Sequence, residues 1–122
     1  MKLDAYDAFC GALPHATLSV QWGGAHVWKI GGKMFAAAMW PDGDESKPPA
    51  VTFKVSDIAF EMLKDEAGCR PAPYLASRGM TWIQRTDARS LNDAMLGDYI
   101  KESYRLVAAG LTKKLQRELG LL

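Results

Sequence analysis

Apolar positions recur with two different periods along this chain, and the change of period separates predicted helices from predicted strands. In residues 3–13 an apolar side chain recurs every three or four positions, at Leu3, Tyr6, Phe9 or Cys10, and Leu13. Residues 91–111 repeat this spacing in a longer stripe that includes Leu96, Ile100, Val107 and Leu111. Such stripes predict helices that bury one face. Thr112 is placed to cap a last short helix over residues 113–122.

The middle of the chain alternates apolar and polar positions, which predicts strands. Residues 16–22 alternate, with Leu18, Val20 and Trp22 on one side. Residues 25–40 contain two β-rich runs that flank Gly31-Gly32, and a glycine pair supplies the positive φ angles of a tight hairpin turn. A polar loop ending in two prolines then leads to a strand over residues 50–55, and a fifth strand is predicted over residues 80–86.

The connection between the last two predicted strands begins with a helix. Ser56 is a suitable N-cap for a helix over residues 57–67, and Gly68 is a suitable stop. The segment that follows, GCRPAPYLASRGMTWIQR, spans residues 68–85. Its two prolines disfavour helical angles in the residues before them, so we expect RPAPYL, residues 70–75, to run extended.

The order of the predicted elements indicates the fold class. The chain runs helix, strands, helix, strand, helix, with hairpins and without alternating β–α–β units. This order predicts an α+β fold, with an antiparallel sheet of about five strands and helices packed on one face. At 122 residues the chain is expected to form one domain, residues 1–122, and to bury a core without a disulfide or metal.

The composition of the chain and its N-terminal segment indicate the compartment in which we expect the protein. Hydrophobic residues make up 48% of the chain and charged residues 24%, as in an ordinary globular protein. No apolar run reaches the ~18 residues of a membrane span, and the first 13 residues are too acidic for a signal peptide, so we expect a cytoplasmic protein without a membrane partner. Cys10 and Cys69 form no CxxC pair, which in a reducing compartment favours inert thiols over a bridge.

No catalytic, phosphate-binding or metal-binding motif is complete in the sequence. The GGK of residues 31–33 lacks the upstream glycine and the following Ser or Thr of a phosphate-binding loop. The cysteines and histidines match no zinc spacing, and there is no nucleophile elbow. We therefore predict a protein that is not an enzyme and that holds neither a cofactor nor a metal.

Charge is unevenly distributed, although the net charge is only +1. Residues 42–66 carry a net charge of −4 and residues 67–91 carry +3, with arginine as the only cationic residue type in the second block. A planar, weakly hydrated guanidinium suits phosphate groups and base edges. A solvated loop with local salt bridges is the alternative interpretation of this block.

The four tryptophans fall in or beside predicted strands: Trp22, Trp28, Trp40 and Trp82. Packing in the core or on a sheet face is their expected role, because each can bury a large apolar area. A stacking platform for unpaired bases would instead need several aromatic residues on one exposed face beside cations.

Five segments, taken in order, match a known family pattern. They are ALPHA at 12–16, KIGGKMFAAAM at 29–39, VTFKVSDIAFEML at 51–63, GCRPAPYLASRGMTWIQ at 68–84 and LGDYIKESYRLVAAGLTKKLQREL at 96–119. Over nearly the whole chain the sequence resembles the MmcQ/YjbR family of small bacterial domains. The resemblance implies a fold similar to that of the bacterial frataxins (CyaY-like), and a DNA-binding role in which two projecting β-loops, a double wing, approach the duplex.

Mapped onto this sequence, the resemblance places one wing at the 29–33 hairpin and the other along the arginine-bearing segment. The candidate nucleic-acid contacts are Lys29, Lys33, Arg70, Arg78, Arg85 and Arg89. We therefore predict a non-catalytic DNA-binding module whose binding is weak and sensitive to salt, because contacts to phosphates dominate it.

Two other functions stay open at this stage. A domain that binds a protein partner would expose a contiguous apolar patch around Tyr74, Met80 and Trp82. A domain that binds a small ligand would hold an apolar cavity between the sheet and the helices, with converging polar groups.

Overall fold

A layer of helices packs on one antiparallel sheet in the computed structural model, which describes residues 1–122, the side chain of Ser77 excepted. The helices are α1 (Leu3–Gly11), α2 (Asp57–Leu63), α3 (Asp93–Ala109) and α4 (Lys113–Glu118), with a 3-10 turn η1 (Ala76–Arg78). The strands are β1 (Thr17–Gln21), β2 (Ala25–Ile30), β3 (Lys33–Met39), β4 (Ala50–Lys54), β5 (Cys69–Pro71) and β6 (Trp82–Arg85). Their order in the sheet is β1-β2-β3-β4-β6-β5. The predicted α+β class is confirmed, and the short β5 is the strand that the sequence pattern did not reveal.

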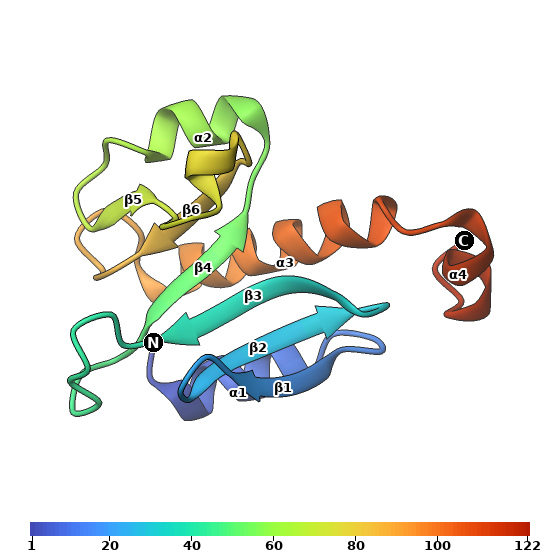
Figure 1. The fold of residues 1–122 in the computed structure, drawn as a ribbon, viewed down its shortest axis with the longest axis horizontal. Coiled ribbons are helices and arrows are strands. Elements are labelled where there is room, and N and C mark those ends of the chain that lie inside the picture. Colours follow the sequence, from blue (N-terminus) through green and yellow to red (C-terminus); the bar gives the residue numbers. More distant parts are fainter.

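The two faces of the sheet have different surroundings (Figure 1). Helices α1 and α3 lie behind the sheet in this view and cover one face. The main buried cluster fills the space between the sheet and these helices, and it includes Ile30, Phe53, Ile83, Leu96 and Ile100. The helix stripes read from the sequence are buried here, which removes their apolar area from water. No helix among the described residues is both long and apolar enough to cross a bilayer.

The opposite face, called the open face below, carries no helix (Figure 1). Val27, Ala37, Thr52 and Gln84 occupy directly paired positions on four neighbouring strands. Paired residues in an antiparallel sheet point to the same face. Arg70, which pairs with Gln84, extends this row onto β5.

A β-bulge changes which side chains of β3 face the helices. Trp28 pairs with Ala36 while the next residue, Lys29, pairs with Met34, so Phe35 is the extra residue. Phe35 and Ala36 both join the main buried cluster. Lys29 therefore lies on the open face, two positions after Val27 on β2, and its partner Met34 on β3 lies there too.

Strands β3 and β4 diverge beyond the bulge (Figure 1). Ser103 of α3 forms a hydrogen bond with each of them. Their last pair is Ala36 with Phe53. The Ser103 hydroxyl donates to the carbonyl oxygen of Phe35 at 2.6 Å and accepts from the backbone N–H of Lys54 at 2.8 Å. These two bonds satisfy backbone groups that would otherwise have paired across the sheet.

Several local predictions are confirmed by the backbone. Gly31 and Gly32 have φ angles of 58° and 79°, as the tight hairpin requires. Ser56 and Thr112 cap α2 and α4, since each side-chain oxygen accepts a backbone N–H of the first turn.

Two local predictions are wrong. The segment 70–75 is extended only at its start, because Tyr74 adopts a φ of 68° and Leu75 is helical. Trp22 does not pack in the core: it is 64% exposed and lies in the β1–β2 turn with a φ of 53°. In both places the chain must reverse or change direction, and the turn overrides the alternating pattern.

Candidate nucleic-acid interface

Arg85, one of the six candidate contacts, is buried rather than exposed. It is 5% exposed, and its pairing with Val51 directs it toward the helix-covered face. Its Nε donates to the carbonyl oxygen of Asp87 and its Nη2 to Oδ1 of Asp93, both at 3.0 Å. The prediction for Arg85 is therefore corrected: its guanidinium joins β6 to the first turn of α3 and does not reach the surface.

Arg89 is exposed, but a neighbouring carboxylate offsets its charge. Its Nε lies 3.0 Å from both carboxylate oxygens of Asp87. The same hydrogen bonds lower the pKa of Asp87, so that the pair stays ionised. Arg89 is thus a weak candidate for binding an external anion.

The other four candidates form no ion pair with a described acidic side chain. Lys29 and Arg70 share the open face. They lie on strands four intervals apart in the sheet, which is roughly 19 Å at the usual strand spacing. Arg78 is exposed in η1, in the loop that follows β5. Lys33 borders a hollow beside the C-terminal half of α3, away from the open face.

The sheet itself carries no negative charge. None of the six strands contains Asp or Glu. An acidic loop precedes β4, and in it Lys47 pairs with Asp42 at 3.3 Å and with Asp44 at 3.6 Å. A hydrogen bond from the Asp44 backbone N–H, supported by Lys47, lowers the pKa of Asp42. These carboxylates are satisfied within their own loop, whereas Glu45 borders a hollow beside Trp22.

A groove of about 360 Å³ crosses the open face. Met34, Ala37 and Met39 of β3 form its apolar floor, and residues 72–75 and Trp22 form its sides. No acidic residue is among the described side chains that line it. The small-ligand hypothesis expected a cavity between sheet and helices, so this groove lies on the other face from the one predicted.

A row of polar side chains lies at one end of the groove floor. Gln84 and Thr52 are 1% and 3% exposed and both line the groove. Nε of Arg70 donates to Oε1 of Gln84 at 2.8 Å, and Nε2 of Gln84 donates to Oγ1 of Thr52 at 3.4 Å. The row holds the Arg70 guanidinium against the sheet while the residue stays exposed.

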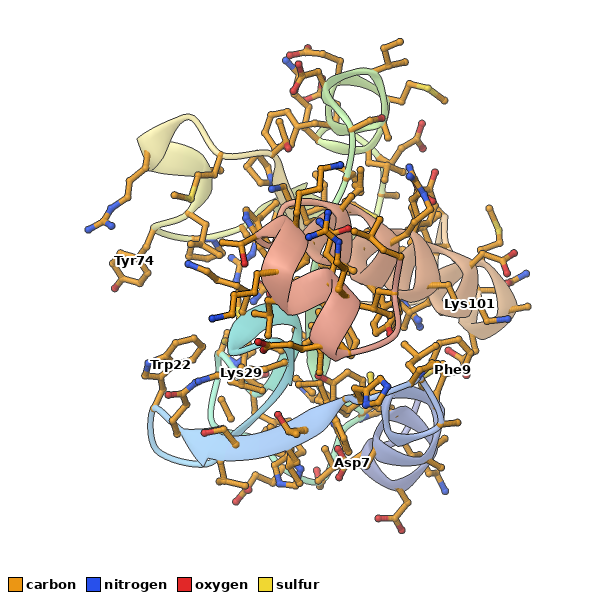
Figure 2. The ribbon with its side chains drawn as sticks, turned by 90° about the vertical axis from the view of Figure 1, so that its right-hand side faces the viewer. Asp7, Phe9, Trp22, Lys29, Tyr74 and Lys101 are labelled. Carbon is orange, nitrogen blue, oxygen red and sulfur yellow. The ribbon has the colours of Figure 1, made fainter. Side chains whose placement is uncertain are left out.

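Two exposed aromatic residues border the groove: Trp22, whose expected role was packing, and Tyr74, which was considered only for a protein-binding patch. Trp22 is 64% exposed and Tyr74 is 86% exposed. Figure 2 shows them projecting on the same side of the molecule, away from α1. Each stands beside turn residues, Trp22 before Gly23-Gly24 and Tyr74 after Pro73, which is the signal that could have identified them.

The apolar patch expected for a protein-binding domain is only partly present. Met80 is 45% exposed, as that hypothesis requires, and Tyr74 is more exposed still. Trp82 is 8% exposed and belongs to the main buried cluster. The three residues therefore do not form one exposed surface.

Together the sheet, its single helix layer and the groove define a small α+β domain with an open β-face. The YjbR family model matches residues 11–106, and the chain belongs to that family, as the resemblance predicted. The crystal structure of Deinococcus radiodurans protein DR2400, which has a DUF419 domain, is similar, with a TM-score of 0.79 and 25% sequence identity. That match covers 98% of this chain and 88% of the other. No curated protein matched the chain.

Proposed function

We propose that this domain binds nucleic acid without catalysing a reaction, and that the open face of its sheet meets the phosphates. The proposal is carried by the charge of the sheet: its strands contain no acidic residue, while Lys29 and Arg70 stand on the open face without an ion-pair partner among the described residues. A phosphate backbone is the polyanion that such a face complements.

The structure reduces the number of phosphates that the domain can neutralise. Arg85 is buried and Arg89 is paired, which leaves Lys29, Lys33 and two arginines, Arg70 and Arg78. Four contacts would give a slope of log K against log salt of about −3.6 on duplex DNA and about −2.8 on a single strand. Because Lys33 lies away from the open face, we expect a slope nearer to that of three contacts.

Fluorescence anisotropy with labelled duplex and single-stranded oligonucleotides, at about 50 and 200 mM salt, tests the proposal. The double variant Lys29→Glu, Arg70→Glu should bind more weakly and show a slope smaller by about 1 for each lost contact. Arg105→Glu is a control for charge reversal elsewhere on the surface, because Arg105 is an exposed arginine of α3 that is already paired with Glu102. Its affinity should stay close to that of the wild type.

Two results would refute the proposal. One is the absence of binding to either oligonucleotide at low salt, and the other is binding with no response to salt. Equal losses in the double variant and in the Arg105→Glu control would show that net charge, rather than the open face, controls the interaction.

A further inference from the structure

We infer that the groove on the open face holds an unpaired nucleobase stacked on Trp22 and Tyr74, so that the domain prefers single-stranded nucleic acid to duplex. This inference rests on the proposed function and goes further, because charge alone does not distinguish the two kinds of strand. It assigns binding roles to two aromatic residues that are not among the cationic candidates.

The two aromatic side chains reach one groove from opposite edges of the sheet. Trp22 belongs to the β1–β2 turn and Tyr74 to the loop after β5, and β1 and β5 are the outermost strands. Both nevertheless line the same groove, and Figure 2 shows both on the side to which Lys29 also belongs. The fold therefore brings a tryptophan and a tyrosine together over an apolar floor.

The backbone conformations of Trp22 and Tyr74 are costly, which indicates a role beyond packing. A large aromatic side chain normally stabilises a fold by burial. Trp22 and Tyr74 also have φ angles of 53° and 68°, and His15 is the one other described residue besides glycine with a positive φ. Such backbone conformations cost about 1–3 kcal/mol and tend to cluster at functional sites.

The groove offers an apolar surface to a base, and cations stand on the same face outside it. Met34, Ala37 and Met39 offer an apolar floor to a flat ring. Lys29 and Arg70, on the same face and roughly 19 Å apart, supply positive charge for phosphates along a strand of several nucleotides. The volume of about 360 Å³ lies at the small end of the range for ligand sites, about 300–1,000 Å³.

Aromatic side chains that present their faces select an unpaired base. In a duplex the faces of the bases are stacked on each other, and a protein meets the base edges and the backbone. In a single strand each base can turn out and stack on an aromatic side chain, while cations follow the backbone. The open face offers both contacts, so the single strand gains a stacking term that the duplex cannot gain.

The test compares three ligands with five proteins. The ligands are a single-stranded oligonucleotide, the matching duplex and heparin, which is a polyanion without bases. The proteins are the wild type, Trp22→Ala, Trp22→Phe and Tyr74→Ala, with Ile58→Ala as a control that truncates an apolar side chain exposed on α2. Thermal unfolding of each variant confirms that it is folded, and affinities are measured by anisotropy or competition at one salt concentration.

We expect Trp22→Ala and Tyr74→Ala each to weaken single-strand binding roughly 5- to 150-fold, the usual effect of losing one stacked base. Heparin and duplex affinities should change little, and Trp22→Phe should recover much of the loss because it retains a flat ring. Ile58→Ala should behave as the wild type. Quenching of tryptophan fluorescence on single-strand binding, absent in Trp22→Ala, would further support stacking.

Other outcomes overturn the inference and separate it from the proposed function. If single strand and duplex bind equally and neither aromatic substitution matters, the charge-based function stands and the stacking site is wrong. If no nucleic acid binds at any salt, both fail. If Trp22→Ala instead dissolves a dimer of the free protein, a second copy of the chain occupies the groove and the base does not.

Discussion

Ser103 closes the sheet where β3 and β4 separate, and its removal gives a sharp test of the fold. The residue is fully buried in α3. Its hydroxyl both donates to Phe35 and accepts from Lys54, so one oxygen atom satisfies a carbonyl and an N–H on two strands. Ser103→Ala removes that oxygen and leaves a space too small for a water molecule with the same contacts.

The expected loss follows from those two bonds. A neutral hydrogen bond contributes a net ~0.5–1.5 kcal/mol, and a buried polar group left without a partner costs ~1–3 kcal/mol. The Phe35 bond is buried, whereas the Lys54 bond is only partly buried. We therefore expect Ser103→Ala to lower the free energy of unfolding by about 2–3 kcal/mol. For a chain of this size that corresponds to a fall in Tm of roughly 6–15 °C.

Urea unfolding followed by circular dichroism measures this loss, and Ser90→Ala serves as the control. Ser90 is a partly exposed serine whose hydroxyl donates to Glu66 at 3.3 Å, and its removal should change stability by less than about 0.5 kcal/mol. A loss below about 1 kcal/mol in Ser103→Ala, with an unchanged m value, would refute the claim that the hydroxyl holds the two strands together.

Two further predictions concern charge and thiol chemistry. The N-terminal amine, and to a smaller extent Arg85, lower the pKa of Asp93. The ionised carboxylate therefore stabilises the fold at pH values above its unfolded pKa of about 3.9. This stabilisation is lost as the pH falls through the lower pKa of the folded state. Asp93→Asn should therefore be less stable at neutral pH and lose less stability on acidification, and parallel acid unfolding curves for the two proteins would contradict this. Burial raises the pKa of the Cys10 thiol to about 12, whereas Cys69 is only partly buried. A thiol reagent at pH 7 should therefore label Cys69 alone in the native protein, and both cysteines after unfolding. Rapid labelling of both thiols in the folded state would show that α1 does not hold Cys10 as described.

The candidate site was predictable in part, for reasons visible at particular residues. Arg70 was identified from the charge pattern and Lys29 from the family resemblance, and the structure places both on the open face. Arg85 belongs to the same cationic block of the sequence as Arg70. It follows Gln84 by one residue on β6, however, and so points to the opposite face of the sheet. The ion pair between Arg85 and Asp93 could not be predicted from the neighbouring sequence, because it depends on where α3 begins relative to the end of β6.

The sequence by itself determined the fold class and every α-helix and strand except β5. Helix stripes, capping residues and the Gly31-Gly32 turn are local features, since they depend on side chains a few positions apart and on the φ angles that glycine permits. The order of the strands in the sheet decided which distant residues come together on one face. The placement of β6 between β4 and β5 is a matter of long-range hydrogen bonding, and it brings residues 72–75 over the sheet, opposite Trp22. Whether a side chain is buried, paired or exposed depends on neighbours supplied by distant segments, and only the packed sheet and helices establish those neighbours.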